Sequence, residues 1–430
     1  MRIYDIIEKK KQGLELSKEE IDFFINGYMN ESIADYQASA LLMAICLKGM
    51  SDEETFFLTD AMMRSGDIVD LSEFEDLTVD KHSTGGVGDK TTLIIAPIVA
   101  SLGCKVAKMS GRGLGYTGGT VDKLESIKGY KSTLSSCDFL KQVKEIGICV
   151  VGQGGNLAPA DKKLYALRDV TATVNSIPLI ASSIMSKKLA SGSKSIVLDV
   201  KCGNGAFMQT VQEATQLANA MIKIGKRFGR NVRALITNMD VPLGHFVGNS
   251  LEIYEAILVL SDKGEKRLTE LCVALATEMV SLGLKISRND AMARVSNAIS
   301  SGLALEKMKE WIAYQGGDVS IFDSPEVLRG AKYKRAILGE QDGFICSLPA
   351  ISIGRASMLL GAGRATKDDK IDHFAGVEIT SGYGCMVNYN EPMGYLYSSN
   401  ENLLMQASEA IAYDLMSSPP NELTLIYDIL

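Results

Sequence analysis

Two glycine-rich segments carry the residues of this chain best suited to chemistry. The first runs from Ser83 to Asp89 behind Lys81 and His82, and the second runs from Ser110 to Thr120. Each follows a short apolar run and precedes a helical pattern, so each is predicted to join a parallel strand to a helix. Such turns present backbone N–H groups and a helix N-terminus to an anion. The two segments therefore predict an anion site.

The side chains that flank these segments match one free phosphate dianion. They offer two ammonium groups and four hydroxyl groups, which are the donors that such an anion accepts. The predicted phosphate-binding residues are Lys81, Ser83, Thr92, Lys108, Ser110 and Thr120. Tight turns without a ligand remain the alternative interpretation.

Neither segment fits a better-known phosphate motif. A Walker A loop requires Gly-Lys-Ser/Thr, but Asp89 separates Gly88 from Lys90. The run Gly113 to Gly118 matches the dinucleotide pattern, yet Asp122 and Glu125 follow almost at once, where they would repel a pyrophosphate. The patterns favour free phosphate over a nucleotide.

The elements that must position these residues are indicated by hydrophobic periodicity. Helices are predicted for the first 65 residues, with capping boxes at Ser17 and Ser51 and helix-terminating glycines at Gly49 and Gly66. Strands are predicted at 77–80, 105–109, 148–152, 195–200 and 232–237. A long helical insertion covers about 158–192, helices fill most of 205–315, and short β-rich runs follow from about 341.

This alternation predicts an α/β protein with a small all-helical domain, a larger domain with a mixed, largely parallel sheet, and a β-rich C-terminal α+β part. We assign residues 1–66 and 158–192 to the helical domain, which is then discontinuous. Residues 67–157 and 193–335 form the α/β phosphate-binding domain, and 336–430 form the C-terminal domain.

Composition excludes several classes of function. The net charge of −7 over 430 residues argues against nucleic-acid and anionic-membrane partners, which select clustered positive charge. No apolar run reaches the roughly 18 residues of a membrane span, and the first residues lack a signal-peptide core. The eight cysteines show neither a C-x-x-C pair nor metal-ligand spacing. We expect a cytoplasmic protein with free thiols.

Four long motifs resemble the pyrimidine-nucleoside and thymidine phosphorylase family. They are KHSTGGVGD (81–89), AKMSGRGLGYTGGTVDKLES (107–126), PADKKLYALRDVTATVNSIPLIASSIMSKKLASG (159–192) and LDVKCGNGAFM (198–208). The similarity runs in register to about residue 365 and is looser beyond. Lys108 before Met109 and Ser110 is more typical of the broad pyrimidine-nucleoside branch than of the strict thymidine branch.

The resemblance implies reversible phosphorolysis, in which a pyrimidine nucleoside (uridine, thymidine or deoxyuridine) and phosphate give a free base and a pentose 1-phosphate. It implies no organic cofactor and a homodimer formed through the small-domain helices. Arg168, Ser183 and Lys187 would bind the pyrimidine and stabilise its negative charge as it leaves; Ser183 and Lys187 share one helix face. Lys163 and Lys188 are assigned to the surface.

His82 is one of only three histidines, and the resemblance places it beside the phosphate. There its imidazolium would be favoured and could give a proton to O2 of the departing base. His82, Arg168 and Lys187 are therefore the predicted catalytic residues. The alternative is a structural turn histidine.

The resemblance also implies a potassium ion near the domain hinge. Its ligands would be backbone oxygens of Gly88, Leu243 and Phe246 and the carboxylate of Glu255. Lys90 stands where the family has a small residue, and an ammonium group cannot ligate a cation. The open alternative is that Lys90 places its own charge beside Glu255. Tyr116, at a position that is usually His, is a second departure.

Three other functions stay in competition. A strict thymidine phosphorylase would share these motifs. A phosphoribosyltransferase would share the fold, but it needs paired acidic magnesium ligands, which Asp89 and Asp122 do not supply as a motif. A catalytically silent nucleoside-binding protein would not need His82, Arg168, Ser183 and Lys187 together.

Overall fold

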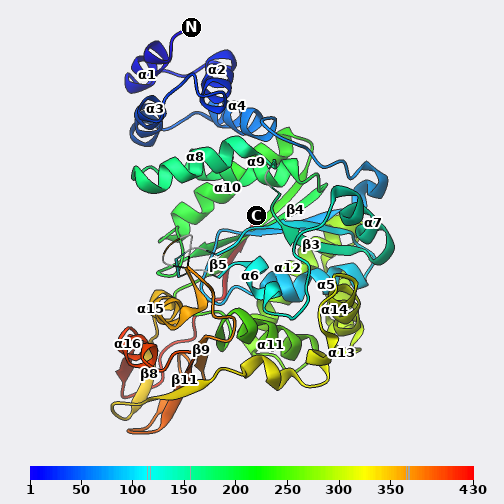
Figure 1. The fold of residues 1–430 in the computed structure, drawn as a ribbon, viewed down its shortest axis with the longest axis vertical. Helices are drawn as coiled ribbons and strands as arrows, with labels where there is room; N and C mark the ends of the chain where they lie inside the picture. Colours follow the sequence, from blue (N-terminus) through cyan, green and yellow to red (C-terminus); the bar gives the residue numbers. More distant parts are fainter. Residues whose placement is uncertain (114, 117, 155, 365, 367–368) are drawn as a thin grey trace.

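A computed structural model of the chain describes residues 1–113, 115–116, 118–154, 156–364, 366 and 369–430. Three layers follow one another along the long axis of the molecule in Figure 1: a helical bundle, an α/β layer and a sheet-rich C-terminal part. The predicted fold class is confirmed.

The helical bundle begins with four helices joined by short turns. They are α1 (Ile3–Lys11), α2 (Lys18–Met29), α3 (Asp35–Lys48) and α4 (Asp52–Met63). Both capping boxes are present, because the hydroxyls of Ser17 and Ser51 accept from the third helical N–H while the glutamates there bond back. Gly49 ends α3 at a φ of 73°.

Gly66 does not end a helix as predicted, since α4 already ends at Met63 with Arg64 as its cap. A Cβ at this position would lie 1.9 Å from the backbone oxygen of Asn156. Glycine is therefore required here because the linker approaches another segment closely, and a helical pattern could not reveal that distant contact.

The central sheet has the order β1-β4-β5-β13. Its strands are β1 (Val79–Ser83), β4 (Ser195–Cys202), β5 (Asn231–Asn238) and β13 (Ile426–Ile429). The first three are parallel and β13 is antiparallel to β5. A parallel pair, β2 (Val106–Ser110) and β3 (Ile148–Gly152), lies beside β1 through the Thr78–Lys105 bridge. All five predicted strands are confirmed within a few residues.

Both faces of the central sheet are covered, which explains why every residue of β4 is buried. Ile196 and Leu198 pack with α10 (Val211–Arg227), whereas Val197 packs with α12 (Lys266–Leu284) on the other face. The remaining helices of this layer are α5 (Thr91–Ser101), α6 (Thr120–Glu125), α7 (Ser136–Ile146), α11 (Asn249–Leu260), α13 (Arg288–Ser300) and α14 (Leu303–Tyr314).

The predicted insertion forms α8 (Pro159–Val170) and α9 (Ile177–Ala190), which lie between the bundle and the sheet (Figure 1). Leu179 belongs to the core of the bundle, whereas Ile184 and Met185 belong to the core around β4 and α10. A helix that is buried on nearly all sides must join two packed bodies. Helix α9 therefore fixes the helical layer on the α/β layer.

The C-terminal part contains two small antiparallel sheets, ordered β6-β9-β11-β7 and β10-β8-β12. Their strands are β6 (Phe246–Gly248), β7 (Tyr333–Leu338), β8 (Gly343–Ser347), β9 (Gly376–Ile379), β10 (Met386–Val387), β11 (Pro392–Ser398) and β12 (Asp414–Met416). Helices α15 (Ala350–Ser357) and α16 (Leu403–Glu409) pack among them, and β13 returns to the central sheet. None of the helices in the described ranges is long and apolar enough to cross a membrane.

Candidate active site

A pocket of about 220 Å³ opens where β1 and β2 end. All six residues predicted to bind phosphate line it: Lys81, Ser83, Thr92, Lys108, Ser110 and Thr120. Ser83 and Ser110 are the last residues of their strands, while Thr92 and Thr120 lie in the first turns of α5 and α6. The parallel topology thus gathers residues that are up to 39 positions apart in the sequence.

The Lys81 ammonium group lies beside two aspartate carboxylates in this pocket. Its Nζ lies 3.3 Å from Asp199 Oδ2 and 3.5 Å from Asp89 Oδ1, and donates to the Thr91 hydroxyl at 2.5 Å. Burial by itself would lower the pKa of Lys81, but the two aspartates together raise it. Lys81 is therefore a permanent cation beneath the first glycine loop.

Asp80 joins two further lysines of the pocket. Its Oδ1 accepts from Lys108 Nζ at 3.0 Å and its Oδ2 accepts from Lys188 Nζ at 2.7 Å. Burial lowers the pKa of Lys108 to about 8, with Asp80 opposing that change and Lys188 adding to it. The ammonium group of Lys108 thus loses its proton at a lower pH than that of Lys81.

The assignment of Lys188 to the surface is wrong. Its side chain is buried, lines the pocket and bonds Asp80. The helical period places Lys188 about 100° around α9 from Lys187, so a one-sided helix would expose one of the two. Only the burial of α9 between two layers brings both ammonium groups to the pocket. Lys163 is partly exposed. Its Nζ donates to Tyr28 O at 2.8 Å and lies over the Tyr28 ring.

The acidic residues after the second glycine segment organise that segment. Asp122 accepts from the backbone N–H of Gly113 at 2.7 Å and from Arg364 at 2.9 Å. Glu125 accepts two bonds from Arg112, which itself lines the pocket. These carboxylates therefore hold the second glycine-rich segment, both through bonds within it and through Arg364 from the C-terminal part. Leu114 and Thr117 of the same segment lie outside the described residues.

His82 lies at the pocket wall on β1, among the lysines. Burial lowers the pKa of its imidazole well below the usual value, and the charges of Lys188, Lys108 and Lys187 lower it further. The imidazolium expected from the sequence therefore requires a nearby anion. A phosphate dianion would offset those positive charges and return basicity to the ring.

The residues assigned to the pyrimidine lie on α8 and α9. Lys187 lines the pocket, pairs with Asp161 and donates to the Ser183 hydroxyl at 3.1 Å, as their i,i+4 spacing predicts. Asp161, which the sequence reasoning did not single out, therefore orients Lys187. Asp161 could have been identified from the sequence, because it lies in the motif 159–192 and in the first turn of α8.

Arg168 is buried at the end of α8, outside the pocket lining. Its guanidinium donates to three backbone oxygens, those of Thr173 at 3.1 Å, Val174 at 2.8 Å and Leu179 at 3.2 Å. Arginine has five N–H donors, so two remain for a ligand. Arg168 consequently shapes the turn between α8 and α9 as well as carrying charge.

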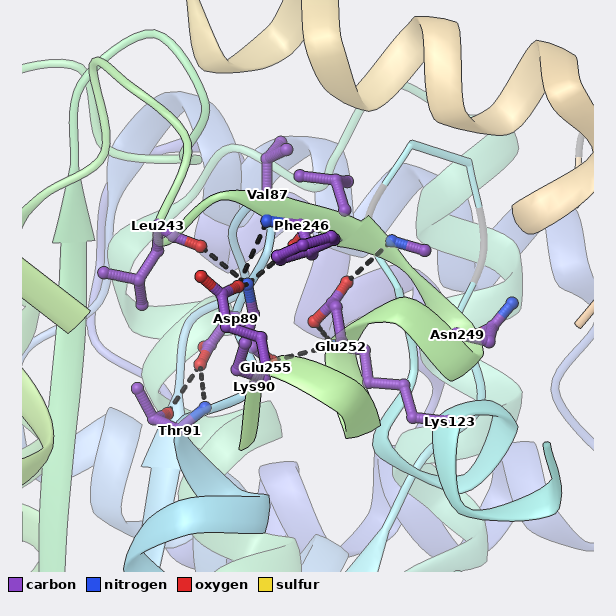
Figure 2. A network of polar contacts seen from close by, with 12 residues as sticks. Val87, Asp89, Lys90, Thr91, Lys123, Leu243, Phe246, Asn249, Glu252 and Glu255 are labelled. Carbon is purple, nitrogen blue, oxygen red and sulfur yellow. Dashed lines mark hydrogen bonds and ion pairs between the residues drawn. The ribbon is translucent and has the colours of Figure 1, made fainter. Parts of the chain in front are cut away.

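The residues predicted to ligate potassium do gather, but around a lysine. Lys90 Nζ lies 2.8 Å from Leu243 O, 2.6 Å from Phe246 O and 2.5 Å from Glu255 Oε2 (Figure 2). Gly88 O accepts from the backbone N–H of Lys90 at 2.9 Å. Because the Lys90 ammonium group lies within hydrogen-bond distance of the Leu243, Phe246 and Glu255 oxygens, the residues present do not fit a metal ion between them.

Comparison with protein families divides the chain into three matched regions. Residues 75–305 match the glycosyl transferase family, a/b domain, and residues 4–66 match the helical bundle domain of that family. Residues 344–415 match the pyrimidine nucleoside phosphorylase C-terminal domain. The relationship therefore extends past residue 365, where the sequence resemblance becomes loose.

Relatives match along the whole chain. A pyrimidine-nucleoside phosphorylase of Staphylococcus haemolyticus is 53% identical over 434 residues, covering 100% of both chains. One of Bacillus subtilis is 53% identical over 404 residues, covering 94% of this chain and 93% of that protein.

Among solved structures, anthranilate phosphoribosyltransferase (TrpD) from Thermus thermophilus has the same fold. It aligns with a TM-score of 0.58 at 17% identity, covering 72% of this chain and 98% of that chain. The family models and the identities agree: this chain belongs to the pyrimidine-nucleoside phosphorylase family, whose members are pentosyltransferases of the glycosyl transferase fold.

Proposed function

We propose that this protein catalyses the reversible phosphorolysis of pyrimidine nucleosides to a free base and a pentose 1-phosphate. The observation that carries the proposal is one pocket that combines all six predicted phosphate donors with His82 and Lys187. Phosphate is then both the nucleophile and the charge that stabilises a developing oxocarbenium ion at C1′. No nucleophilic side chain is required.

The leaving pyrimidine carries negative charge over O2, N3 and O4. Lys187 and Ser183, coupled to each other on α9, and Arg168 at the end of α8 supply the donors for that charge. His82 supplies a proton at O2 once phosphate has raised the basicity of its ring. The carboxylate of Asp161 pairs with the ammonium group of Lys187 and so directs it.

The relatives' names favour a broad pyrimidine substrate range over a strict thymidine phosphorylase. The likeness to a phosphoribosyltransferase at 17% identity concerns the fold alone. In this chain, Asp122 bonds Gly113 and Arg364, and Asp89 lies between Lys81 and Thr91. Acids so engaged are not free to carry the magnesium ions of a sugar pyrophosphate.

The direct test is a panel of uridine, thymidine and deoxyuridine, assayed by ultraviolet absorbance. Base is expected to appear only when inorganic phosphate is added, with turnover of all three nucleosides. Release of base without phosphate, or formation of nucleotide from base and phosphoribosyl pyrophosphate instead, would overturn the proposal. Turnover of thymidine alone would restrict it to the thymidine branch.

Proton donation by His82 predicts a separation of kcat from KM. His82→Ala should lower kcat about 10²-fold or more, and should raise the KM for phosphate far less. His82→Gln, which keeps a hydrogen-bond donor but cannot give up a proton, should resemble His82→Ala. Both losses should shrink with a nucleoside whose 5-substituent withdraws electrons, because that base leaves without a proton. If His82→Gln turned over the nucleoside at the wild-type rate, His82 would not be the proton donor.

The pKa of Lys108 predicts how phosphate binding depends on pH. Above pH 8 the amine becomes neutral, so phosphate affinity should fall by up to about tenfold per pH unit. Lys81 stays charged in this range because its pKa is raised. Calorimetric titration with phosphate alone avoids the ionisation of the base. Lys108→Arg should remove the pH dependence; an unchanged dependence in that variant would assign it to another group.

A homodimer through the bundle helices is proposed on the same family relationship. Helix α3 exposes Tyr36, Met43 and Leu47 on one face, with Tyr36 76% and Leu47 75% exposed. Sedimentation equilibrium should give twice the chain mass, and Leu47→Asp should give monomers. Tyr389→Asp, an exposed aromatic position far along the chain, serves as the control. A dimer that survives Leu47→Asp would place the contact elsewhere.

A further inference from the structure

Lys90 is a fully enclosed lysine directly after the first glycine-rich segment. Its side chain is fully buried, and its Nζ contacts two backbone oxygens and one carboxylate oxygen, all within 2.8 Å. An ammonium group has three N–H donors. Each donor of Lys90 has one acceptor, so the group is satisfied without water.

The carboxylate opposite Lys90 is equally satisfied. Glu255 Oε1 accepts from the N–H of His245 at 2.6 Å, and Oε2 accepts from the N–H of Phe246 at 3.1 Å in addition to Lys90. Gly244 lets the loop wrap this carboxylate, because a Cβ there would lie 2.5 Å from Glu255 Oε2 and its φ is 75°. The loop 243–246 is thus built around one positive charge.

The same oxygens form a set suited to a monovalent metal ion. Two carbonyls and a carboxylate are hard oxygen ligands, which alkali ions prefer. An ammonium group and a potassium ion carry the same charge and are similar in size. Here the charge is attached to the chain, and a second cation beside Lys90 would be repelled at short range.

The Lys90 ammonium group connects the first glycine-rich segment to the rest of the α/β layer. Lys90 follows Asp89, whose Oδ1 accepts from the Thr91 hydroxyl, and that hydroxyl also accepts from Lys81. The N–H of Leu243 donates to Val87 O at 3.1 Å, which closes the loop 243–246 on the glycine segment (Figure 2). Lys90 thereby fixes the start of α5 against β6 and α11.

A second buried lysine strengthens the same connection. Lys123 Nζ lies 2.7 Å from Glu252 Oε2 and donates to Asp89 O at 2.8 Å. Glu252 and Glu255 are both on α11, so two lysines from the two glycine segments meet one helix (Figure 2). The orientation of both phosphate loops therefore depends on cations that face α11.

We propose that the Lys90 ammonium is a built-in monovalent cation, which makes the folding and the phosphate site of this protein independent of potassium. The activity part of this inference rests on the proposed function; the stability part does not. A protein with this group needs neither free potassium nor another alkali ion to neutralise Glu255.

The first experiment uses the wild-type protein. Thermal unfolding is followed in potassium chloride and in choline chloride at matched ionic strength and pH. The two unfolding temperatures should coincide across the titration, and turnover should be the same in both salts. A saturable increase of either quantity that is specific to potassium would overturn the proposal. This measurement does not depend on any variant that might fail to fold.

The second experiment removes the Lys90 ammonium group and offers free potassium in its place. Lys90→Thr leaves a hydroxyl, two carbonyls and the carboxylate of Glu255 facing the space of the ammonium group. In choline chloride this variant should unfold several degrees lower than wild type, since Glu255 is left buried and unpaired. Potassium should restore its unfolding temperature progressively with the logarithm of its concentration.

Lys10→Thr provides the matched control. Lys10 is a buried lysine of the helical bundle, and its Nζ bonds both carboxylate oxygens of Glu54 at 2.7 and 2.9 Å. The Lys10→Thr variant should unfold below the wild-type temperature by the same amount in potassium chloride and in choline chloride. If Lys90→Thr responds to potassium no more than Lys10→Thr does, the loop is not a cation site and the proposal fails. Failure of the nucleoside assay would leave these unfolding results intact.

Discussion

Four lysine ammonium groups converge on one small pocket, and the carboxylates beside them make that convergence possible. Asp199 and Asp89 lie beside Lys81, Asp80 joins Lys108 to Lys188, and Asp161 pairs with Lys187. Buried charges without partners would be expelled or neutralised. Pairing keeps the lysines in place with limited net charge, so that an incoming dianion finds preformed donors.

The placement of these carboxylates also explains how the layers cooperate. Asp80 is on β1 yet bonds lysines from β2 and α9, so a single carboxylate connects the sheet, its neighbouring strand pair and the helix between the layers. Lys108, which is predicted to bind phosphate, and Lys188 on the helix that carries Lys187 therefore share one carboxylate. Burial lowers the pKa of the His82 imidazole, and the charges of Lys188, Lys108 and Lys187 lower it further.

Lys90 and Glu255 form another buried pair of opposite charges. The lysine balances Glu255 where an alkali ion would otherwise be needed, and it does so beside the first glycine segment. A tethered charge loses less entropy on ordering than a free ion does, and it cannot be removed by dilution. On the proposal above, Lys90 changes which ions the fold requires without altering a residue assigned to the chemistry.

The sequence by itself determined the secondary-structure elements and which strand ends meet, because strand–glycine–helix patterns are local and parallel strands place their ends together. The capping boxes at Ser17 and Ser51, the five strands and the gathering in one pocket of the six residues predicted to bind phosphate follow from such short-range rules. Tertiary structure decided the partners of the pocket lysines, whereas the sequence had already offered Glu255 as the partner of Lys90. Lys188 became a pocket residue and Gly66 a close-contact residue through burial between segments more than 85 positions apart, which no local pattern records.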